Sequence, residues 1–378
     1  MRILHTIYDD PQNPWLGGGG AYRTFEICAK LSDRHDITIL TGKYPGCEEQ
    51  EEWRGCRILR VGSNRSYARS RLGYSFAAPR IVEEAPIDLW VYSFSAFAPI
   101  IVSESARSHS ILECFHVMQD HASEKRGLLG KAAAVIEART LRTYDRIISI
   151  SPSVLERIAG IRSSDDGINL VYTGVDDSCF IDDPEEEDYI LYFGRLDTYT
   201  KGLDLLFEAF AAVGEAASGI RLVVAGKGTP ERLRELKQLA DRSGVTGRVE
   251  FTGPVDEATK RELFRKSLFN VAPSRYEGWC IAAVEASAAG KAVVGTRIPG
   301  LQDAVRHDET GILVEPENVA QIADAMRVLL GDPERRKQLG QQGRTWSEQF
   351  TWDNVAESQG RVYEDILAER GAGRQVSQ

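Results

Sequence analysis

Residues 273–316 read PSRYEGWCIAAVEASAAGKAVVGTRIPGLQDAVRHDETGILVEP and indicate a β–loop–α–β unit. Glu277 falls in the loop that follows the apolar run 268–273, and Glu285 falls on the alanine-rich helix after it. Alanine favours helix and adds little bulk, so this helix can lie close to a sheet and turn its N-terminal N–H groups toward an anion. A buried-strand run at 292–296 completes the unit.

The same alternation of strands and helices extends along the chain. Helical stretches separate several of the apolar strand-like runs, so the pattern predicts an α/β fold with parallel sheets covered on both faces. The strand-like runs span residues 2–7, 36–41, 89–92, 110–115, 146–150, 169–172, 189–193, 220–225, 248–252 and 268–272.

The length of 378 residues predicts two domains. An acidic stretch at 176–188, DDSCFIDDPEEED, interrupts the repeating α/β units, and we place the interdomain linker there. The predicted domains are residues 1–180 and 181–353, followed by a last helix at about 354–370.

Composition argues against several classes of protein. The net charge of −10 disfavours a nucleic-acid partner, which needs a large basic surface. No apolar run reaches the ~18–20 residues that span a bilayer. The start, MRILHTIYDD, lacks the basic region and long apolar core of a secretory signal. Six scattered cysteines include no CxxC pair, which indicates a cytoplasmic protein without a structural metal.

Two features of the N-terminal half point to ligand chemistry. Four glycines separate the first strand from the first helix, where an α/β sheet meets phosphate, although a flexible turn explains them equally well. They are Gly17, Gly18, Gly19 and Gly20. Neither GxGxxG nor a Walker sequence occurs, so dinucleotide and P-loop sites lose support. His116 closes the run 110–115, at the strand end that faces ligands, although a lone histidine is more often structural.

The stretch from Arg54 to Arg80 contains seven arginines and no acid, in a chain that is acidic elsewhere. One interpretation is a solvated loop and helix face. The other is a patch for an anionic acceptor or an anionic membrane, which would place the protein peripherally at the inner membrane face.

In order along the chain, these pieces resemble the retaining GT-B glycosyltransferases of family 4, the glycosyl transferases group 1. The resemblance covers essentially the whole chain. Its motifs are the four-glycine loop, His116, GRL at 194–196, KG at 201–202, AGKG at 225–228, TGPV at 252–255 and EGWCIAAVE at 277–285.

The resemblance implies the GT-B architecture, in which two Rossmann-like domains with parallel sheets face each other across a cleft. It also implies that the N-terminal domain binds the acceptor and the C-terminal domain binds the nucleotide-sugar donor. The last helix of the family packs back on the N-terminal domain.

The resemblance implies a site as well. Arg195 and Lys201 would meet the negative charge that grows on the leaving diphosphate, because arginine can fork onto two phosphate oxygens and lysine supplies a point charge. Glu277 would accept hydrogen bonds from the donor sugar, Glu285 from the ribose, and His116 would orient a sugar hydroxyl. The other predicted substrate-binding residues are the four loop glycines, Gly278, Trp279, Cys280 and Ile281.

We therefore expect a retaining hexosyltransferase that uses a UDP or GDP sugar and a hydroxyl acceptor, which is a sugar, a lipid-linked molecule or a small molecule. We expect no cofactor and no metal, since the Asp-x-Asp pair of metal-dependent transferases is missing. A catalytically silent nucleotide-sugar-binding subunit and a sugar-nucleotide epimerase stay open as alternatives. Trp279 and Cys280 replace the family's common Phe-Gly, so the backbone at Cys280 must suit a residue with a Cβ, and Trp279 is expected to narrow the sugar pocket.

Overall fold

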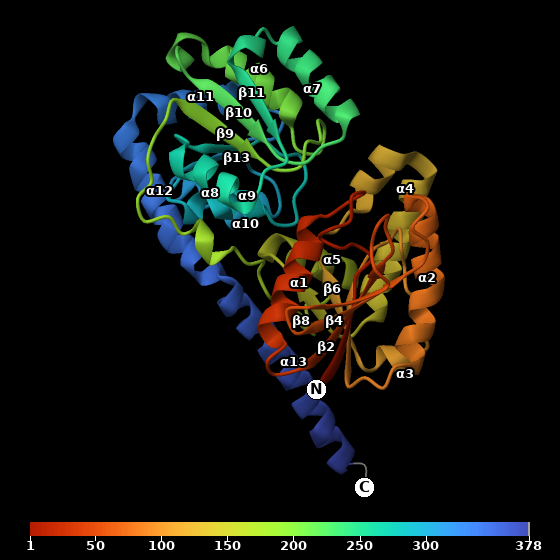
Figure 1. Ribbon diagram of the computed structural model, residues 1–378. Coiled ribbons are helices and arrows are strands. Elements are labelled where there is room, and N and C mark those ends of the chain that lie inside the picture. The colour runs from red at the N-terminus through yellow and green to blue at the C-terminus, as the bar shows by residue number, and fades with distance from the viewer. Residues whose placement is uncertain (377–378) are drawn as a thin grey trace. The chain divides into compact units, whose positions relative to one another are not determined.

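The computed structural model describes residues 1–376, and the side chains of all of these except 119–126 and 369–376. The chain forms two compact units (Figure 1). Unit 1 comprises Met1–Gly174 and the C-terminal segment that begins at Trp352, and unit 2 comprises Val175–Thr351. The first break therefore lies at 174/175, a little before the position predicted from the sequence.

Unit 1 is built on an eight-stranded sheet in the order β3-β4-β2-β1-β5-β6-β7-β8. All neighbouring strands are parallel except β3 and β4, which are antiparallel. Leaving β3 aside, the order reverses between β1 and β5, as in a Rossmann sheet. The strands are β1 Arg2–Thr6, β2 Asp36–Gly42, β3 Gln50–Trp53, β4 Cys56–Val61, β5 Leu89–Ser93, β6 Ser110–Cys114, β7 Ile147–Ser149 and β8 Ile168–Leu170.

Helices cover both faces of this sheet, as the sequence predicts. Successive side chains of β1 point to opposite faces, so Ile3 joins the core beneath α1 and α13, whereas Leu4 joins the core beneath α2, α4 and α5. The helices are α1 Gly19–Leu31, α2 Tyr67–Glu84, α3 Glu104–Arg107, α4 Gln119–Thr143, α5 Pro152–Arg162 and α13 Trp352–Val376.

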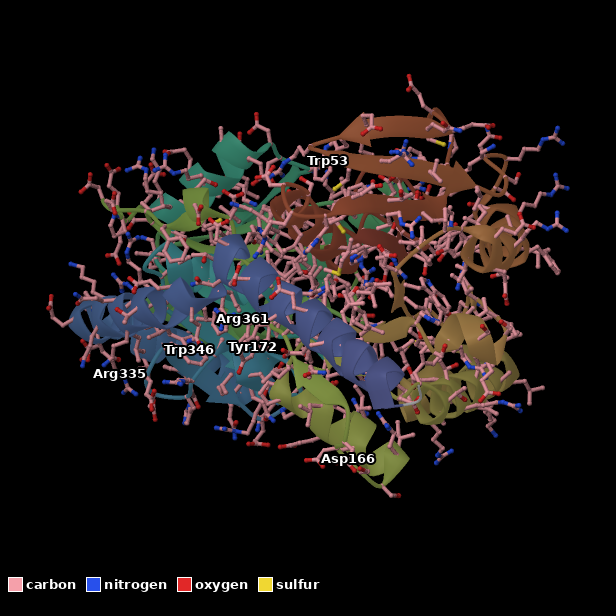
Figure 2. All side chains as sticks on the ribbon, turned by 90° about the horizontal axis from the view of Figure 1, so that it is seen from below. Trp53, Asp166, Tyr172, Arg335, Trp346 and Arg361 are labelled. Carbon is pink, nitrogen blue, oxygen red and sulfur yellow. The ribbon has the colours of Figure 1, made fainter. Side chains whose placement is uncertain are left out.

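The C-terminal helix α13 packs back on unit 1, beside α1 (Figure 1). A buried polar network joins them. Arg23 of α1 donates to Glu113 of β6 at 2.6 Å and to Gln359 of α13 at 2.8 Å. Arg361, by contrast, lies on the outward side of α13 (Figure 2). No helix in the described part of the chain is long and apolar enough to cross a membrane.

The arginine stretch does not form the single exposed patch that its composition suggested. Residues 56–61 form β4, and Arg60 is buried there and donates from Nε to Asp10 at 3.0 Å. Arg54 pairs with Glu26 at 2.8 Å. The sequence did not predict β4. Buried and exposed residues alternate along this short strand, and its arginines suggested a solvated loop instead.

Unit 2 contains a six-stranded, fully parallel sheet in the order β11-β10-β9-β12-β13-β14, with the reversal between β9 and β12. The strands are β9 Tyr189–Phe193, β10 Arg221–Ala225, β11 Val249–Gly253, β12 Asn270–Ala272, β13 Val293–Thr296 and β14 Gly311–Val314. The helices are α6 Leu203–Val213, α7 Pro230–Arg242, α8 Glu257–Lys266, α9 Ile281–Ala288, α10 Leu301–Ala304, α11 Val319–Gly331 and α12 Pro333–Ser347.

The acidic stretch predicted as a linker belongs to unit 2. Its carboxylates bind cations of that unit, which holds the segment against α8 and α12 rather than leaving it free. The pairs are Asp182–Arg344 at 2.8 Å, Glu185–Arg265 at 2.6 Å, Glu186–Arg336 at 2.6 Å and Glu187–Lys266 at 2.9 Å.

Candidate active site

Two loops of unit 2 leave neighbouring strands at the reversal point of the sheet. The loop at 194–202 follows β9, and the loop at 273–280 follows β12, which pairs with β9. In open α/β sheets, ligands bind beyond the carboxyl ends of the strands at this reversal. Both loops therefore start at the position where a site is expected.

These loops bring Lys201 and Glu277 together. The Lys201 ammonium lies 2.6 Å from Glu277 Oε1, and the Ser274 hydroxyl donates to the same oxygen at 2.8 Å. The Glu277 side chain is 8% exposed and that of Lys201 is 20% exposed. The pair thus combines a largely buried cation, which is suited to phosphate, with a buried carboxylate, which is suited to sugar hydroxyls.

The electrostatics keep Lys201 charged. Burial acts to lower its pKa, but the negative charge of Glu277, with the Cys280 thiol and the hydrogen bond, outweighs that effect and raises it. Arg195 is exposed on the same loop, near enough that its charge opposes the rise slightly. The two predicted phosphate-binding cations of unit 2 are therefore neighbours.

The second glutamate has an unforeseen partner. Glu285 lies on α9, and its Oε1 accepts a hydrogen bond from Lys260 of α8 at 3.0 Å. Lys260 also contacts Glu257 at 2.5 Å. Burial raises the pKa of Glu285, and Lys260 opposes the rise by favouring the charged carboxylate.

The residues between the glutamates form the start of α9. The helix begins at Ile281 with Cys280 as its N-cap, and Gly278 precedes them in the loop. Cys280 has φ −93°, an ordinary value for a residue with a Cβ, so the expectation at this departure from the family is confirmed. Trp279 is only 6% exposed and packs edge-on against Phe350, with ring centres 5.1 Å apart. Its ring is part of the packing of unit 2, which leaves little of it to contact a ligand.

The glycine loop of unit 1 is arranged differently from the prediction. The Asp9 carboxylate accepts the N–H groups of Gly17 at 3.1 Å and Gly18 at 2.8 Å, so a side chain of the same loop occupies these two amides. Helix α1 begins at Gly19, and a Cβ at Gly20 would lie 2.7 Å from the ring of Phe115. The N–H groups at the start of a helix have no partner within it, so those of Gly19 and Gly20 differ from those of Gly17 and Gly18, which Asp9 accepts.

His116 follows β6 and is exposed. Its carbonyl accepts the Cys114 thiol at 3.3 Å. It thus occupies the carboxyl end of a strand of unit 1, as predicted, whereas the cations and glutamates come from unit 2.

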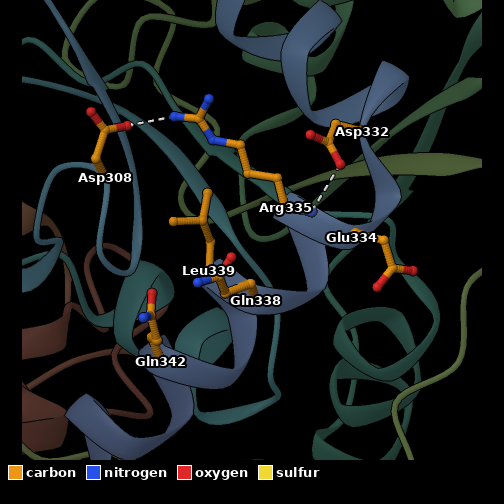
Figure 3. Close-up of a pocket in the computed structure, with 7 residues that line it drawn as sticks. All are labelled: Asp308, Asp332, Glu334, Arg335, Gln338, Leu339 and Gln342. Carbon is orange, nitrogen blue, oxygen red and sulfur yellow. Dashed lines mark hydrogen bonds and ion pairs between the residues drawn. The ribbon is translucent and has the colours of Figure 1, made fainter.

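A separate pocket of about 420 Å³ lies on α12 and contains none of the predicted site residues (Figure 3). Arg335 donates to Asp308 at 2.7 Å, and its backbone N–H donates to Asp332 at 3.0 Å. Asp308, Asp332 and Arg335 of this pocket are therefore bound to one another. The lining residues are Asp308, Asp332, Glu334, Arg335, Gln338, Leu339 and Gln342. Among all side chains that the structure describes, no three His, Cys, Asp or Glu residues gather as metal ligands would.

Comparison with known proteins identifies the family. Residues 17–178 match the model described as Glycosyltransferase Family 4, and residues 180–346 match the model described as Glycosyl transferases group 1. An uncharacterized glycosyltransferase of Methanocaldococcus jannaschii is 31% identical over 98% of this chain and 100% of its own length. The chain belongs to glycosyltransferase family 4.

Other relatives agree with this assignment. The glycogen synthase of Mycobacterium tuberculosis is 30% identical to this glycosyltransferase, over 98% of the chain and 96% of the relative. Sucrose-phosphate synthase from Thermosynechococcus elongatus has a TM-score of 0.80 at 21% identity, covering 98% of this chain and all of that one. HepE of Anabaena, solved with UDP and glucose, has a TM-score of 0.74 at 17% identity over 97% and 99% of the two chains.

The predicted GT-B fold is thus confirmed, as is the enzyme class, a glycosyltransferase. Sequence reasoning missed Asp9, Ser274 and Lys260. Ser274 stands three residues before Glu277, and Asp9 shares a loop with Gly17, so local sequence held a signal for both. Lys260 is 25 residues from Glu285, and local sequence held no signal for their pairing.

Proposed function

We propose that this glycosyltransferase moves a hexose-type sugar from a UDP or GDP donor to a hydroxyl acceptor, with retention of anomeric configuration and without a metal. The observation that carries the proposal is the pairing of Lys201 with Glu277 on the two loops that leave β9 and β12. HepE, which shares the fold, was solved in complexes with UDP, with UDP-glucose, and with UDP and glucose.

In the proposed reaction, the bond between the sugar C1 and the diphosphate oxygen breaks, and a new C1–O bond forms to the acceptor on the same face. The acceptor proton passes to the leaving diphosphate oxygen. Lys201 and Arg195 would bind the charge that develops on the diphosphate, since donors fixed in advance are usually the largest catalytic contribution. Glu277 would hold sugar hydroxyls, Glu285 the ribose, and His116 would orient a hydroxyl of the sugar.

When the donor binds, Glu277 need not release Lys201 entirely. A carboxylate has two oxygens and accepts more than one hydrogen bond on each. The first turn of α9, at Ile281, and the first turn of α1, at Gly19 and Gly20, would supply backbone N–H groups to phosphate. Asp9 would keep Gly17 and Gly18 from doing so unless it moved or became protonated.

A panel of nucleotide sugars tests the proposal. A donor that binds the folded protein raises its melting temperature by mass action, and UDP and GDP sugars are compared at equal concentrations. Donors that shift the melting temperature are then incubated with hydroxyl acceptors, and the anomeric configuration of the product is read by NMR. Inversion of configuration, or activity that disappears with a chelator and returns with added metal, would contradict the proposal.

We propose in addition that one face of α2 contacts an anionic membrane. Arg69, Leu72, Phe76 and Arg80 follow one another at intervals of three or four residues, so they lie on one side of the helix. All four are exposed, Leu72 to 60% and Phe76 to 76%. Exposed apolar side chains flanked by cations are suited to a negatively charged lipid surface.

The matched variants for this surface are Phe76→Ser and Val328→Ser, the second on α11 of unit 2 with 39% exposure. Sedimentation with vesicles containing anionic lipid should fall for Phe76→Ser and for the wild type at high salt, but not for Val328→Ser. If the wild type does not bind these vesicles, or if its binding does not change with salt concentration, this part of the proposal is wrong.

A further inference from the structure

Lys201 and Glu277 belong to different loops, so their pairing depends on how firmly the two loops are joined. Arg275 lies in the second loop, two residues before Glu277, and its side chain is 8% exposed. Its guanidinium reaches across to the first loop. It is therefore placed to fix the distance between the two members of the pair.

Arg275 makes several hydrogen bonds with the first loop and with the start of α6, which follows that loop. Its two terminal nitrogens donate to the two oxygens of Asp204, in the first turn of α6, at 2.8 and 2.7 Å. Nη1 also donates to the backbone carbonyl of Tyr199 at 2.8 Å, and the guanidinium lies 4.7 Å from the centre of the Tyr199 ring. The backbone N–H of Arg275 donates to the carbonyl of Thr200 at 2.9 Å. Thr200 immediately precedes Lys201.

Glu317 completes the arrangement from a third segment, just after β14. It accepts from Arg275 Nη2 at 3.0 Å and also from Nε. The backbone of Glu317 has φ +59°, a left-handed conformation that residues with a Cβ rarely adopt. Such a conformation persists only where surrounding contacts over-determine it. The guanidinium thus joins three segments, and all five of its N–H groups have an acceptor.

The backbones of the two loops also touch directly. Gly202 has φ +64°, and a Cβ there would lie 1.9 Å from the carbonyl oxygen of Pro273. Lys201 is therefore flanked by Thr200, which is bonded to Arg275, and by Gly202, which rests on the start of the second loop. Movement of either loop would move the ammonium relative to the Glu277 carboxylate.

We propose that Arg275 is a positioning residue that holds Lys201 and Glu277 in the geometry required for donor binding and sugar transfer, an inference that rests on the proposed function. Its planar fork binds Asp204 through two parallel hydrogen bonds, which a lysine ammonium cannot reproduce. Because a misplacement of about 1 Å can cost on the order of 100-fold in rate, loosening this clamp should lower turnover without removing any group that touches substrate.

The experiment compares Arg275→Gln and Arg275→Lys with Arg336→Gln. Arg336 is a matched control because its side chain is 6% exposed and it forks onto Glu186 at 2.9 and 2.6 Å, in the same unit but in neither loop. Three properties are measured for each variant: the melting temperature, the hydrogen exchange of residues 194–203 without ligand, and kcat/KM for the nucleotide-sugar donor.

We expect Arg275→Gln to increase exchange in 194–203 and to lower kcat/KM for the donor by about 100-fold, with Arg275→Lys between this variant and the wild type. Arg336→Gln should lower the melting temperature without either effect. Wild-type exchange and kinetics in Arg275→Gln would overturn the inference, and so would the same losses in Arg336→Gln. Absence of nucleotide-sugar turnover in the wild type would instead overturn the proposed function. The hydrogen-exchange measurement needs no substrate, so it tests whether Arg275 holds the loop at 194–203 independently of the proposed function.

A double-variant cycle separates positioning from general loss of stability. If Arg275 acts through Lys201, then Arg275→Gln should cause little further loss of kcat/KM in a Lys201→Ala background. Losses that multiply in the double variant would show that Arg275 acts independently of Lys201, and the inference would be wrong.

Discussion

The ammonium of Lys260 lies 3.0 Å from Oε1 of Glu285, and each of these side chains is 8% exposed. The glutamate expected to bind the donor ribose is therefore already held by a buried cation from the preceding helix. Glu285 Oε1 accepts from the ammonium, and in the proposed complex Oε2 would accept from a ribose hydroxyl. Lys260 thereby fixes the orientation of Glu285 and favours its charged form, against the burial that raises the pKa of this carboxyl.

Replacement of Lys260 by methionine should destabilise the protein by about 3 kcal/mol, because it leaves a buried carboxylate without its counter-ion. Denaturant unfolding at neutral pH measures this change. The double variant Lys260→Met with Glu285→Gln should be more stable than Lys260→Met, since no unpaired charge remains. It should bind UDP or GDP more weakly than the wild type, because it lacks the Glu285 carboxylate. Nucleotide binding by Glu285→Gln equal to that of the wild type would contradict the assignment of Glu285 to the ribose.

Lys201→Ala and Glu277→Ala should each abolish most sugar transfer. Loss of one fixed donor to developing charge typically costs about 100- to 1000-fold in kcat, and we expect Lys201→Ala to fall in this range. Steady-state kinetics with the donor found in the nucleotide-sugar panel measures the loss. Lys237→Ala, on the exposed side of α7, is the control for removing a lysine. Near-wild-type turnover in either site variant would refute the site.

Asp9 should make stability depend on pH. Burial raises its pKa to about 6, against the opposing hydrogen bonds from Gly18, Gly17 and Asp10. An unfolded aspartate has a pKa near ~3.9, so the folded protein binds this proton more tightly. By linkage, the stabilising contribution of Asp9 is complete below pH ~4 and is lost as the pH rises through about 6.

The measurement is the free energy of unfolding of the wild type minus that of Asp9→Asn, at several pH values across this window. The difference should fall as the pH rises, because the asparagine does not titrate. His5, whose pKa is lowered to about 4 by burial, titrates with the opposite effect on stability but is present in both proteins and cancels. Parallel curves for the two proteins would show that Asp9 does not titrate in this window.

The buried network that holds Gln359 of α13 on unit 1, which includes the ion pair of Arg23 in α1 with Glu113 in β6, should stabilise the protein more than the exposed ion pair of Arg34 with Glu357 of α13. Arg23 and Glu113 are 1% and 0% exposed, so Glu113→Gln should cost about 3 kcal/mol by leaving Arg23 buried without its counter-ion. Arg34 and Glu357 are 45% and 46% exposed, and Arg34→Ala should cost below about 1 kcal/mol. Denaturant unfolding of the two variants compares them directly, and equal losses would contradict the ranking.

Local sequence was sufficient to predict much of this fold. The strand at Tyr189–Phe193 appears with the predicted bounds, and α1 begins two residues earlier than expected. Such elements follow from apolar periodicity and from glycine and proline, which act over a few residues. The strand β14 and the hairpin of β3 and β4 were missed. β3 and β14 have only four residues each, and the formation of such short strands depends on the neighbours with which they pair.

The sequence by itself determined the family, and it named Arg195, Lys201, Glu277 and Glu285 as candidate site residues because they are part of an ordered series of motifs. Only the tertiary structure decided which partners those groups have. Lys201 meets Glu277 across 76 residues of chain, Glu285 meets Lys260, and Asp9 occupies the amides of Gly17 and Gly18. The physical reason is that a charge is satisfied by whatever opposite charge or N–H group lies within about 3 Å, and that distance is set by the order of strands in a sheet rather than by spacing along the chain.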